Sequence, residues 1–81
     1  MYLKERTASD VRSGDRIRLH QWEDSSALKS TLRSTWNGRP AVVLTLEQTL
    51  PHPHTGTPYS QTWEVFCDPH EPLWTVHNGP P

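Results

Sequence analysis

Three histidines and the single cysteine are the residues of this chain whose types and spacing could bind a metal ion. His52 and His54 lie in the segment LPHPHTGTP, and Cys67 and His70 lie in FCDPHEP. Imidazole nitrogen and thiolate sulfur are the ligands that zinc prefers in structural sites, where four of them form a tetrahedron. The sequence therefore raises a zinc site made of these four residues as a hypothesis.

The strand that must position these ligands argues against zinc. A strand over residues 60–67 would separate the loop with the first two histidines from the turn that follows the cysteine. At 3.2–3.4 Å per residue such a strand is about 23–26 Å long, whereas zinc–ligand bonds are about 2.0–2.3 Å. Zinc binding is therefore the third of three binding hypotheses, and no metal or other cofactor is expected.

The same cysteine could act as a nucleophile only beside a general base. Cysteine catalysis requires a thiolate, a base within hydrogen-bond reach and a third group that orients the base. His70 and His77 are the candidate bases, but Asp68 beside His70 would raise the thiol pKa by charge repulsion. Cys67 shares the inner face of its strand with Trp63, where a structural cysteine is unreactive. No catalytic residue is assigned, and we expect a protein that is not an enzyme.

Composition bounds the size and the partners of the protein. Its 81 residues suffice for one domain, and a chain of this length has a thin core. Eight basic and nine acidic side chains leave a net charge of −1, which argues against a strongly electrostatic grip on nucleic acid. One cysteine permits no intramolecular disulfide, and no apolar run is as long as a membrane span. These features predict a cytoplasmic protein that does not enter a membrane.

Alternation of apolar and polar residues predicts a mostly β protein. Val42, Leu44 and Leu46 share one face of the clearest strand, and β-branched neighbours suit such a pleated surface. Turn-forming residues separate the apolar runs at intervals that are typical of small sandwiches and barrels. The expected strands cover residues 15–21, 27–35, 40–47, 60–67 and 73–77.

The expected fold is a single small five-stranded SH3-like barrel or a curled antiparallel sheet. The segment GDRIRL and the five-strand layout resemble many SH3-like small barrels, a resemblance of architecture that implies no activity. Closure into a barrel would remove exposed strand edges. The domain is expected over residues 11–78, after a polar lead-in at 1–10 and before a flexible tail at 79–81.

Residues 25–36 fit either a strand or a helix. Leu28, Leu32 and Trp36 are spaced four apart, which matches the apolar stripe of a helix and also one face of a strand. The serines and threonines between them are mediocre helix formers, and threonine prefers strands. The alternative to the all-β fold is an α+β fold, with a helix at about 25–36 packed on a four-stranded sheet.

The register of the following hairpin favours the strand. A three-residue loop at 36–38 would place Leu32 opposite Val42 and Leu28 opposite Leu46. All of these apolar side chains would then meet on one face. A two-residue loop would shift the register by one residue and place basic side chains at those positions instead. We therefore expect the three-residue loop.

A proline-rich loop and exposed tryptophans predict a protein-binding module. The loop at 48–59 is long enough to be functional, and its prolines stiffen it. Trp36 would stand at a hairpin tip, and tryptophan is enriched at the energetic centres of interfaces. The first hypothesis is therefore a non-enzymatic module that binds a protein partner or a second copy of itself. The expected protein-binding residues are Trp22, Trp36, His52, His54 and Tyr59.

A weak nucleic-acid-binding barrel is the second hypothesis. If residues 27–35 form a strand, basic side chains follow the outer faces of the first two strands, near aromatic residues. Barrels that bind single strands use this combination for phosphates and bases. The ordinary solvated face of a half-buried sheet would show the same pattern. The residues of this hypothesis are Arg16, Arg18, Lys29 and Arg33.

Overall fold

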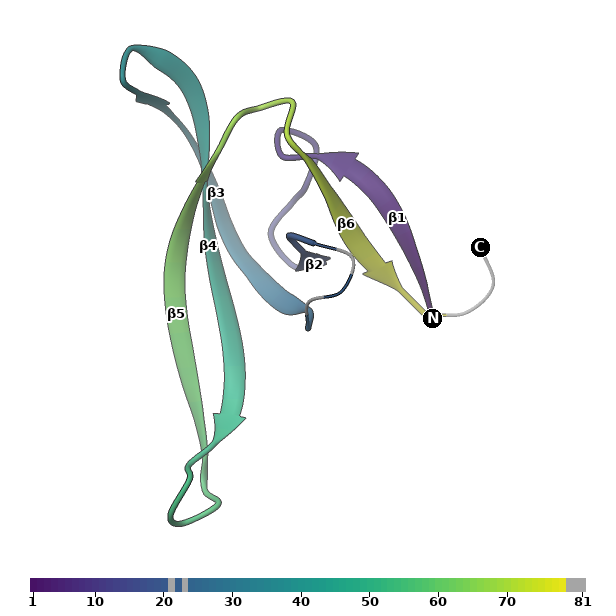
Figure 1. Ribbon diagram of the computed structural model, residues 1–81, viewed down its shortest axis with the longest axis vertical. Helices are drawn as coiled ribbons and strands as arrows, with labels where there is room; N and C mark the ends of the chain where they lie inside the picture. The colour runs from purple at the N-terminus through teal and green to yellow at the C-terminus, as the bar shows by residue number, and fades with distance from the viewer. Residues whose placement is uncertain (21, 23, 79–81) are drawn as a thin grey trace.

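The computed structural model shows one six-stranded antiparallel sheet (Figure 1). It describes residues 1–20, 22 and 24–78, and these contain no helix, hence none that could cross a membrane. The order of the strands across the sheet is β1-β6-β2-β3-β4-β5. The strands are β1 (Tyr2–Thr7), β2 (Arg16–Arg18), β3 (Ser26–Trp36), β4 (Arg39–Pro51), β5 (Pro58–Cys67) and β6 (Pro72–His77).

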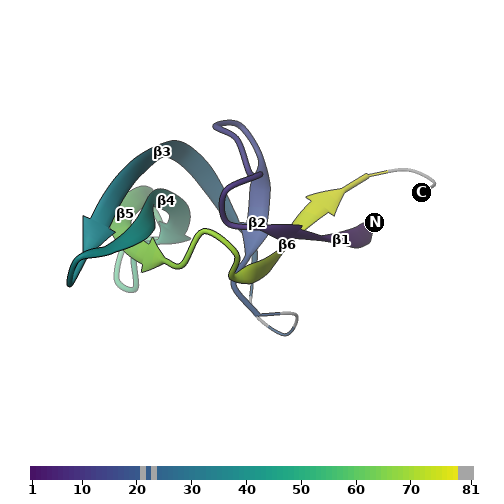
Figure 2. The ribbon, with the colours of Figure 1, turned by 90° about the horizontal axis from the view of Figure 1, so that it is seen from above.

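The sheet curls but does not close into a barrel. β3, β4 and β5 lie on one side of β2, and β1 and β6 lie on the other (Figure 2). In the described part of the chain β1 pairs only with β6 and β5 only with β4, so both ends of the sheet are open. The mostly β fold and the curled antiparallel sheet are therefore confirmed. The alternative helix at about 25–36 is wrong, because Ser26–Trp36 form β3.

Residues 1–10, expected as a polar lead-in, contain β1. The strand pairs with β6 along its whole length, beginning with Tyr2 opposite His77. None of its side chains is fully buried, so its sequence YLKERT does not need apolar residues at alternate positions. Backbone hydrogen bonds hold such an edge strand in place, and a search for apolar alternation does not detect them. The tail at 79–81 lies outside the described residues.

The side chains of the hydrophobic core gather on one face of the sheet, which is referred to as the inner face. Val42, Leu44 and Leu46 of β4 form its centre, as their alternation predicts. Leu28 of β3 lies opposite Leu46 and is also buried. Full burial of one such side chain contributes about 1.5–3 kcal/mol. The other members of the core are Ala8, Val11, Ile17, Cys67 and Leu73.

A two-residue turn joins β3 to β4, so the expected three-residue loop is wrong. Asn37 and Gly38 have φ angles of 51° and 76°, and Trp36 lies opposite Arg39. A type I′ turn requires positive φ at both central residues, and Asn-Gly meets this requirement at the lowest cost. The backbone twist of a type I′ turn also matches the right-handed twist of the two strands that it joins.

The two-residue turn shifts the outer part of β3 by one residue. Leu32 lies opposite Val43 rather than Val42, and Arg33 takes the place opposite Val42. Directly opposite side chains of antiparallel strands share a face, so Leu32 lies on the outer face of the sheet. Its side chain is consequently 65% exposed.

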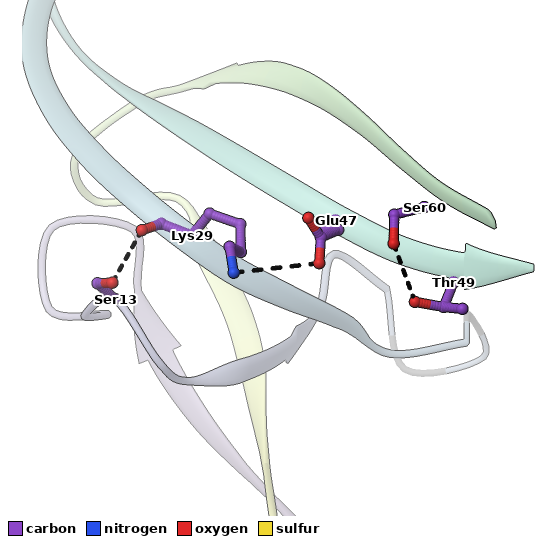
Figure 3. Close-up of polar contacts among 5 residues, drawn as sticks. All are labelled: Ser13, Lys29, Glu47, Thr49 and Ser60. Carbon is purple, nitrogen blue, oxygen red and sulfur yellow. Dashed lines mark hydrogen bonds and ion pairs between the residues drawn. The ribbon is translucent and has the colours of Figure 1, made fainter. Parts of the chain in front are cut away.

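A β-bulge at Lys29 restores the register in the inner part of the hairpin. The pairing shifts between Leu28 and Ser30, so Leu28 still lies opposite Leu46 as expected. A bulge inserts one extra residue into one strand and thereby cancels a one-residue shift. The Lys29 side chain extends to Glu47 on the outer face, with Nζ 4.0 Å from Oε1 (Figure 3).

The turn at residues 13–15 supplies hydrogen-bond partners for the backbone of the bulge. Ser13 Oγ donates to the carbonyl of Lys29 at 2.8 Å (Figure 3). The Gly14 N–H donates to the carbonyl of Leu28 at 2.9 Å, and the Leu28 N–H donates to the carbonyl of Asp15 at 2.8 Å. Backbone groups at a bulge lose ladder partners and must be satisfied elsewhere. The turn therefore holds the bulge at this position.

The two faces of the hairpin lead to opposite predictions for two leucines. Leu44 is fully buried, so Leu44→Ala should lower the free energy of unfolding by about 2–5 kcal/mol. Leu32 is mostly exposed, so Leu32→Ala should change that free energy by less than about 0.5 kcal/mol. Urea unfolding followed by tryptophan fluorescence measures both values. A loss of about 2 kcal/mol or more from Leu32→Ala would place this side chain in the core and contradict the two-residue register.

Candidate protein-binding surface

Three exposed apolar side chains gather on the outer face of β3, β4 and β5. Trp36 of β3 is 58% exposed and Phe66 of β5 is 47% exposed, and their ring centroids are 5.0 Å apart. Leu32 and Phe66 lie on either side of Val43, which is buried between them. Leu32, Trp36, Phe66 and Val43 are referred to as the apolar patch.

The strand pairing explains why the apolar patch faces outward. Because Val42 and Leu44 point to the core, Val43 between them must point to the other face. Leu32 of β3 and Phe66 of β5 lie directly opposite Val43 and therefore share that face. The exposed fractions of Leu32 and Phe66 show that no described segment covers them. A contiguous exposed apolar surface of this kind is a candidate contact site.

A groove opens beside the apolar patch where β5 ends. The last pair between β4 and β5 joins Val42 to Cys67, so residues 39–41 of β4 are paired with β3 on one side and have no β5 residue on the other. The groove has a volume of about 450 Å³, and Trp36, Phe66 and Ala41 are among the residues that line it. Its volume lies within the range of small-ligand pockets, and its lining is mainly apolar.

One charge of each sign lies at this groove. Arg39 is the first residue of β4, and Asp68 directly follows β5; both line the groove and both are exposed. Asp68 Oδ1 accepts a hydrogen bond from the His70 N–H at 2.9 Å, which orients the carboxylate in the turn after β5. Within the described residues no ion pair joins the two charges, so each is available to a partner.

The predicted protein-binding residues lie in three separate places. Trp36 belongs to the apolar patch, whereas His52 and Tyr59 lie at the opposite end of β4. Since β4 has 13 residues, its two ends are separated by roughly 40 Å at about 3.3 Å per residue. Trp22 is 82% exposed and stacks on His20, with ring centroids 4.8 Å apart. The structure therefore does not combine these residues into one site.

The proline-rich loop is shorter than the range 48–59 suggests. β4 extends to Pro51 and β5 begins at Pro58, so half of the expected loop belongs to the two strands and only residues 52–57 connect them. The His54 N–H donates to His52 Nδ1 at 3.2 Å, and the two imidazole rings have centroids 5.8 Å apart. The segment is a tight turn that carries two histidines, and Tyr59 lies beside His52 at a ring distance of 6.3 Å.

The four basic residues predicted to bind nucleic acid do not share one face of the sheet. Arg33 lies opposite Val42 and therefore belongs to the inner face. Lys29 extends to Glu47 on the outer face, and this carboxylate offsets its charge. The two arginines of β2 lie near the middle of the sheet. Arg16 and Arg18 flank the buried Ile17 and therefore lie on the outer face with Lys29, so only Arg33 is separated from the other three.

The structure does not bring the four residues of the zinc hypothesis together. His52 and His54 precede β5, whereas Cys67 is its last residue and His70 follows it. The two pairs consequently lie at opposite ends of a ten-residue strand. In the part of the chain that the structure describes, no cluster of three or more histidine, cysteine, aspartate or glutamate side chains could hold a metal ion.

Sequence reasoning missed Leu32 and Phe66 as members of the binding surface. The alternation along β5 already placed Phe66 on the outer face of the sheet, because its neighbour Cys67 lies on the inner face. The Asn-Gly dipeptide at 37–38 was the signal for Leu32, because this dipeptide is the strongest indicator of a two-residue turn. With that turn, Leu32 and Trp36 both face outward.

Known proteins give no further guidance on this surface. Comparisons of the chain with protein-family models, with curated proteins and with solved structures find no match.

Cys67 is a buried thiol with a suppressed acidity. Burial, followed by a hydrogen bond to Glu71 and the negative charge of that side chain, raises the pKa of the Cys67 thiol from 9.0 to about 12. Nucleophilic cysteines need the thiolate near neutral pH. Cys67 is protonated in that range.

The raised pKa of Cys67 leads to a prediction about reactivity and stability. At pH 8 the folded protein should react with a disulfide reagent such as DTNB far more slowly than the urea-unfolded protein. Between pH 9 and about 12 the unfolded thiol releases its proton while the folded thiol retains it. The unfolded state then binds fewer protons, so the free energy of unfolding should fall as the pH rises through this range.

Cys67→Ala is the control for the stability measurement, since it lacks the thiol and keeps every other titrating group. We expect urea unfolding at pH 8, 9.5 and 11 to show that the free energy of unfolding falls more steeply with pH in the wild type than in Cys67→Ala. Rapid stoichiometric labelling of the folded protein at pH 8 would contradict the assigned pKa.

Proposed function

We propose that this protein is a non-enzymatic binding module that engages a protein partner through the apolar patch. The observation that carries the proposal is the side-by-side exposure of Leu32, Trp36 and Phe66 on one sheet face. Adjoining exposed apolar side chains gain free energy when a partner covers them, and contiguous apolar patches are typical of interaction sites. Tryptophan at such a position is the residue type most enriched at interface hot spots.

The rigidity of the surface supports a binding role. β4 pairs with β3 on one side and with β5 on the other, so three continuous strands support the apolar patch. Val43 and Ala41 of β4 lie on the same face as the exposed side chains and are buried. A surface that is ordered before binding loses little conformational entropy when the partner docks.

The charges around the surface favour a protein over a nucleic acid. Arg39 and Asp68 at the groove cancel each other, and the net charge of the chain is −1. Affinity for a phosphate backbone comes mainly from basic side chains that displace counterions. A neutral apolar surface with polar edges instead has the composition of a protein–protein interface. The cytoplasmic location expected from the sequence is part of the proposal, and the free thiol of Cys67 fits a reducing compartment.

Substitution of Trp36 tests the proposal. We expect Trp36→Ala to weaken partner binding by about 30-fold or more, the effect of removing a central hot-spot tryptophan. The measurement is affinity capture from the native cell, with the recovered proteins quantified for wild type and variant. The captured partner is then titrated against both proteins by calorimetry, which gives the dissociation constants.

Trp22→Ala is the matched control for this experiment. Trp22 is even more exposed than Trp36, and it lies before β3 whereas Trp36 is the last residue of that strand. Both variants remove one exposed indole, but only Trp36→Ala alters the apolar patch. Equal loss of binding in the two variants, or none in either, would contradict the proposed surface.

A further inference from the structure

We propose that the occupant of the apolar patch is a second copy of this chain, packed face to face in a two-fold symmetric dimer. The inference rests on the proposed function, since it names the partner of the same surface. In a two-fold contact each copy contributes the same residues, so the surface must be complementary to itself. Its charge, its shape and its area each bear on this requirement.

The charges at the groove are complementary to themselves. Arg39 and Asp68 line the same groove, and no ion pair joins them within one copy in the described part of the chain. A two-fold axis that passes between them sets Arg39 of each copy against Asp68 of the other. Symmetry then forms two ion pairs in one contact. Opposite charges that meet across an interface fix its register and exclude other partners.

The shape of the surface suits another sheet. Domains bury an apolar sheet face against a second layer, and the described chain provides such a layer only for the inner face. The outer face of β3, β4 and β5 carries Val43 and Ala41 beneath Trp36 and Phe66, as the inner face of a sandwich would. The same three strands of a second copy, stacked at about 10 Å, would supply the missing layer.

The area of the apolar patch sets the expected strength of the dimer. An aromatic side chain buries about 150–250 Å², so the exposed parts of Trp36 and Phe66, together with Leu32, provide roughly 300–400 Å² per copy. A standard interface buries about 800 Å² per partner, so polar side chains must form the remainder of the contact. Serines and threonines of the outer face surround the patch: Ser30, Ser34, Thr45 and Thr62. A contact with this little apolar area is smaller than that of an obligate dimer, so we expect a reversible dimer whose population rises with protein concentration.

Analytical ultracentrifugation of the whole chain at about 1–500 µM tests the inference, because a reversible dimer with a micromolar dissociation constant changes its state of association within this range. Wild type should pass from monomer to dimer across this range, and Trp36→Ala should remain a monomer throughout. Trp22→Ala should dimerise like wild type. A wild-type protein that stays monomeric at the highest concentration would overturn the dimer, and so would a dimer that Trp36→Ala does not weaken. The proposed function would still stand if a different protein were captured in a Trp36-dependent manner.

A charge exchange tests the pairing of Arg39 with Asp68. Arg39→Asp and Asp68→Arg should each weaken self-association by about tenfold or more, because like charges then meet across the two-fold axis. An equal mixture of the two variants should restore association, since each new charge meets an opposite charge on the other chain. A folding defect would not be corrected by mixing.

The control for the charge exchange is Glu5→Arg, which changes an exposed charge on β1, at the other end of the sheet from β5. This variant should dimerise like wild type. A mixture of the two exchange variants that stays monomeric while wild type dimerises would overturn the face-to-face arrangement. Circular dichroism verifies folding, and if Asp68→Arg loses its structure the Trp36→Ala result decides alone.

Discussion

The bulge at Lys29 reconciles two demands that a regular β3–β4 hairpin cannot meet together. The Asn-Gly turn imposes a two-residue connection, whereas the core requires Leu28 opposite Leu46. An unbroken ladder from that turn would place Lys29 in the core instead. One extra residue removes the conflict, and the turn at 13–15 satisfies the backbone that the bulge leaves unpaired. The inner half of the hairpin therefore packs in the core, and the outer half presents Leu32 to solvent.

Local patterns predicted the parts of the fold that local physics determines. Alternation identified the inner face of β4, because period two follows from the pleat of a single strand. The strand expected at 27–35 was chosen over a helix from the preference of threonine for strands and from the hairpin register. The strand is present as β3, but the register used to infer it was wrong by one residue. The register of the hairpin depends on a bulge whose carbonyl is bound by Ser13, 16 residues before Lys29. The residues of β3 alone therefore do not show where the bulge lies. β1 was missed for a related reason, since pairing with β6 holds it without a buried face.

The candidate site shows the same division. Trp36 was predicted as a contact residue from its type and its position at a hairpin end, and that assignment remains part of the proposal. Its companions Leu32 and Phe66 come from different strands, and only the register brings them together. The histidines were grouped with Trp36 in sequence reasoning, but the length of β4 separates them. Distances across a sheet follow from pairing, which composition and motif spacing do not encode.

The pairing of β1 with β6 has a consequence for how the chain assembles during synthesis. Lys4 and Thr75, which are joined by a hydrogen bond, are 71 residues apart, so at about 5–20 residues per second β1 waits roughly 4–14 s for its partner. The β3–β4–β5 meander needs only neighbouring segments and can form during that delay. During this delay the N–H and C=O groups of β1 have no partner strand. Its charged run Lys4, Glu5 and Arg6 makes it a poor template for neighbouring chains on the same messenger.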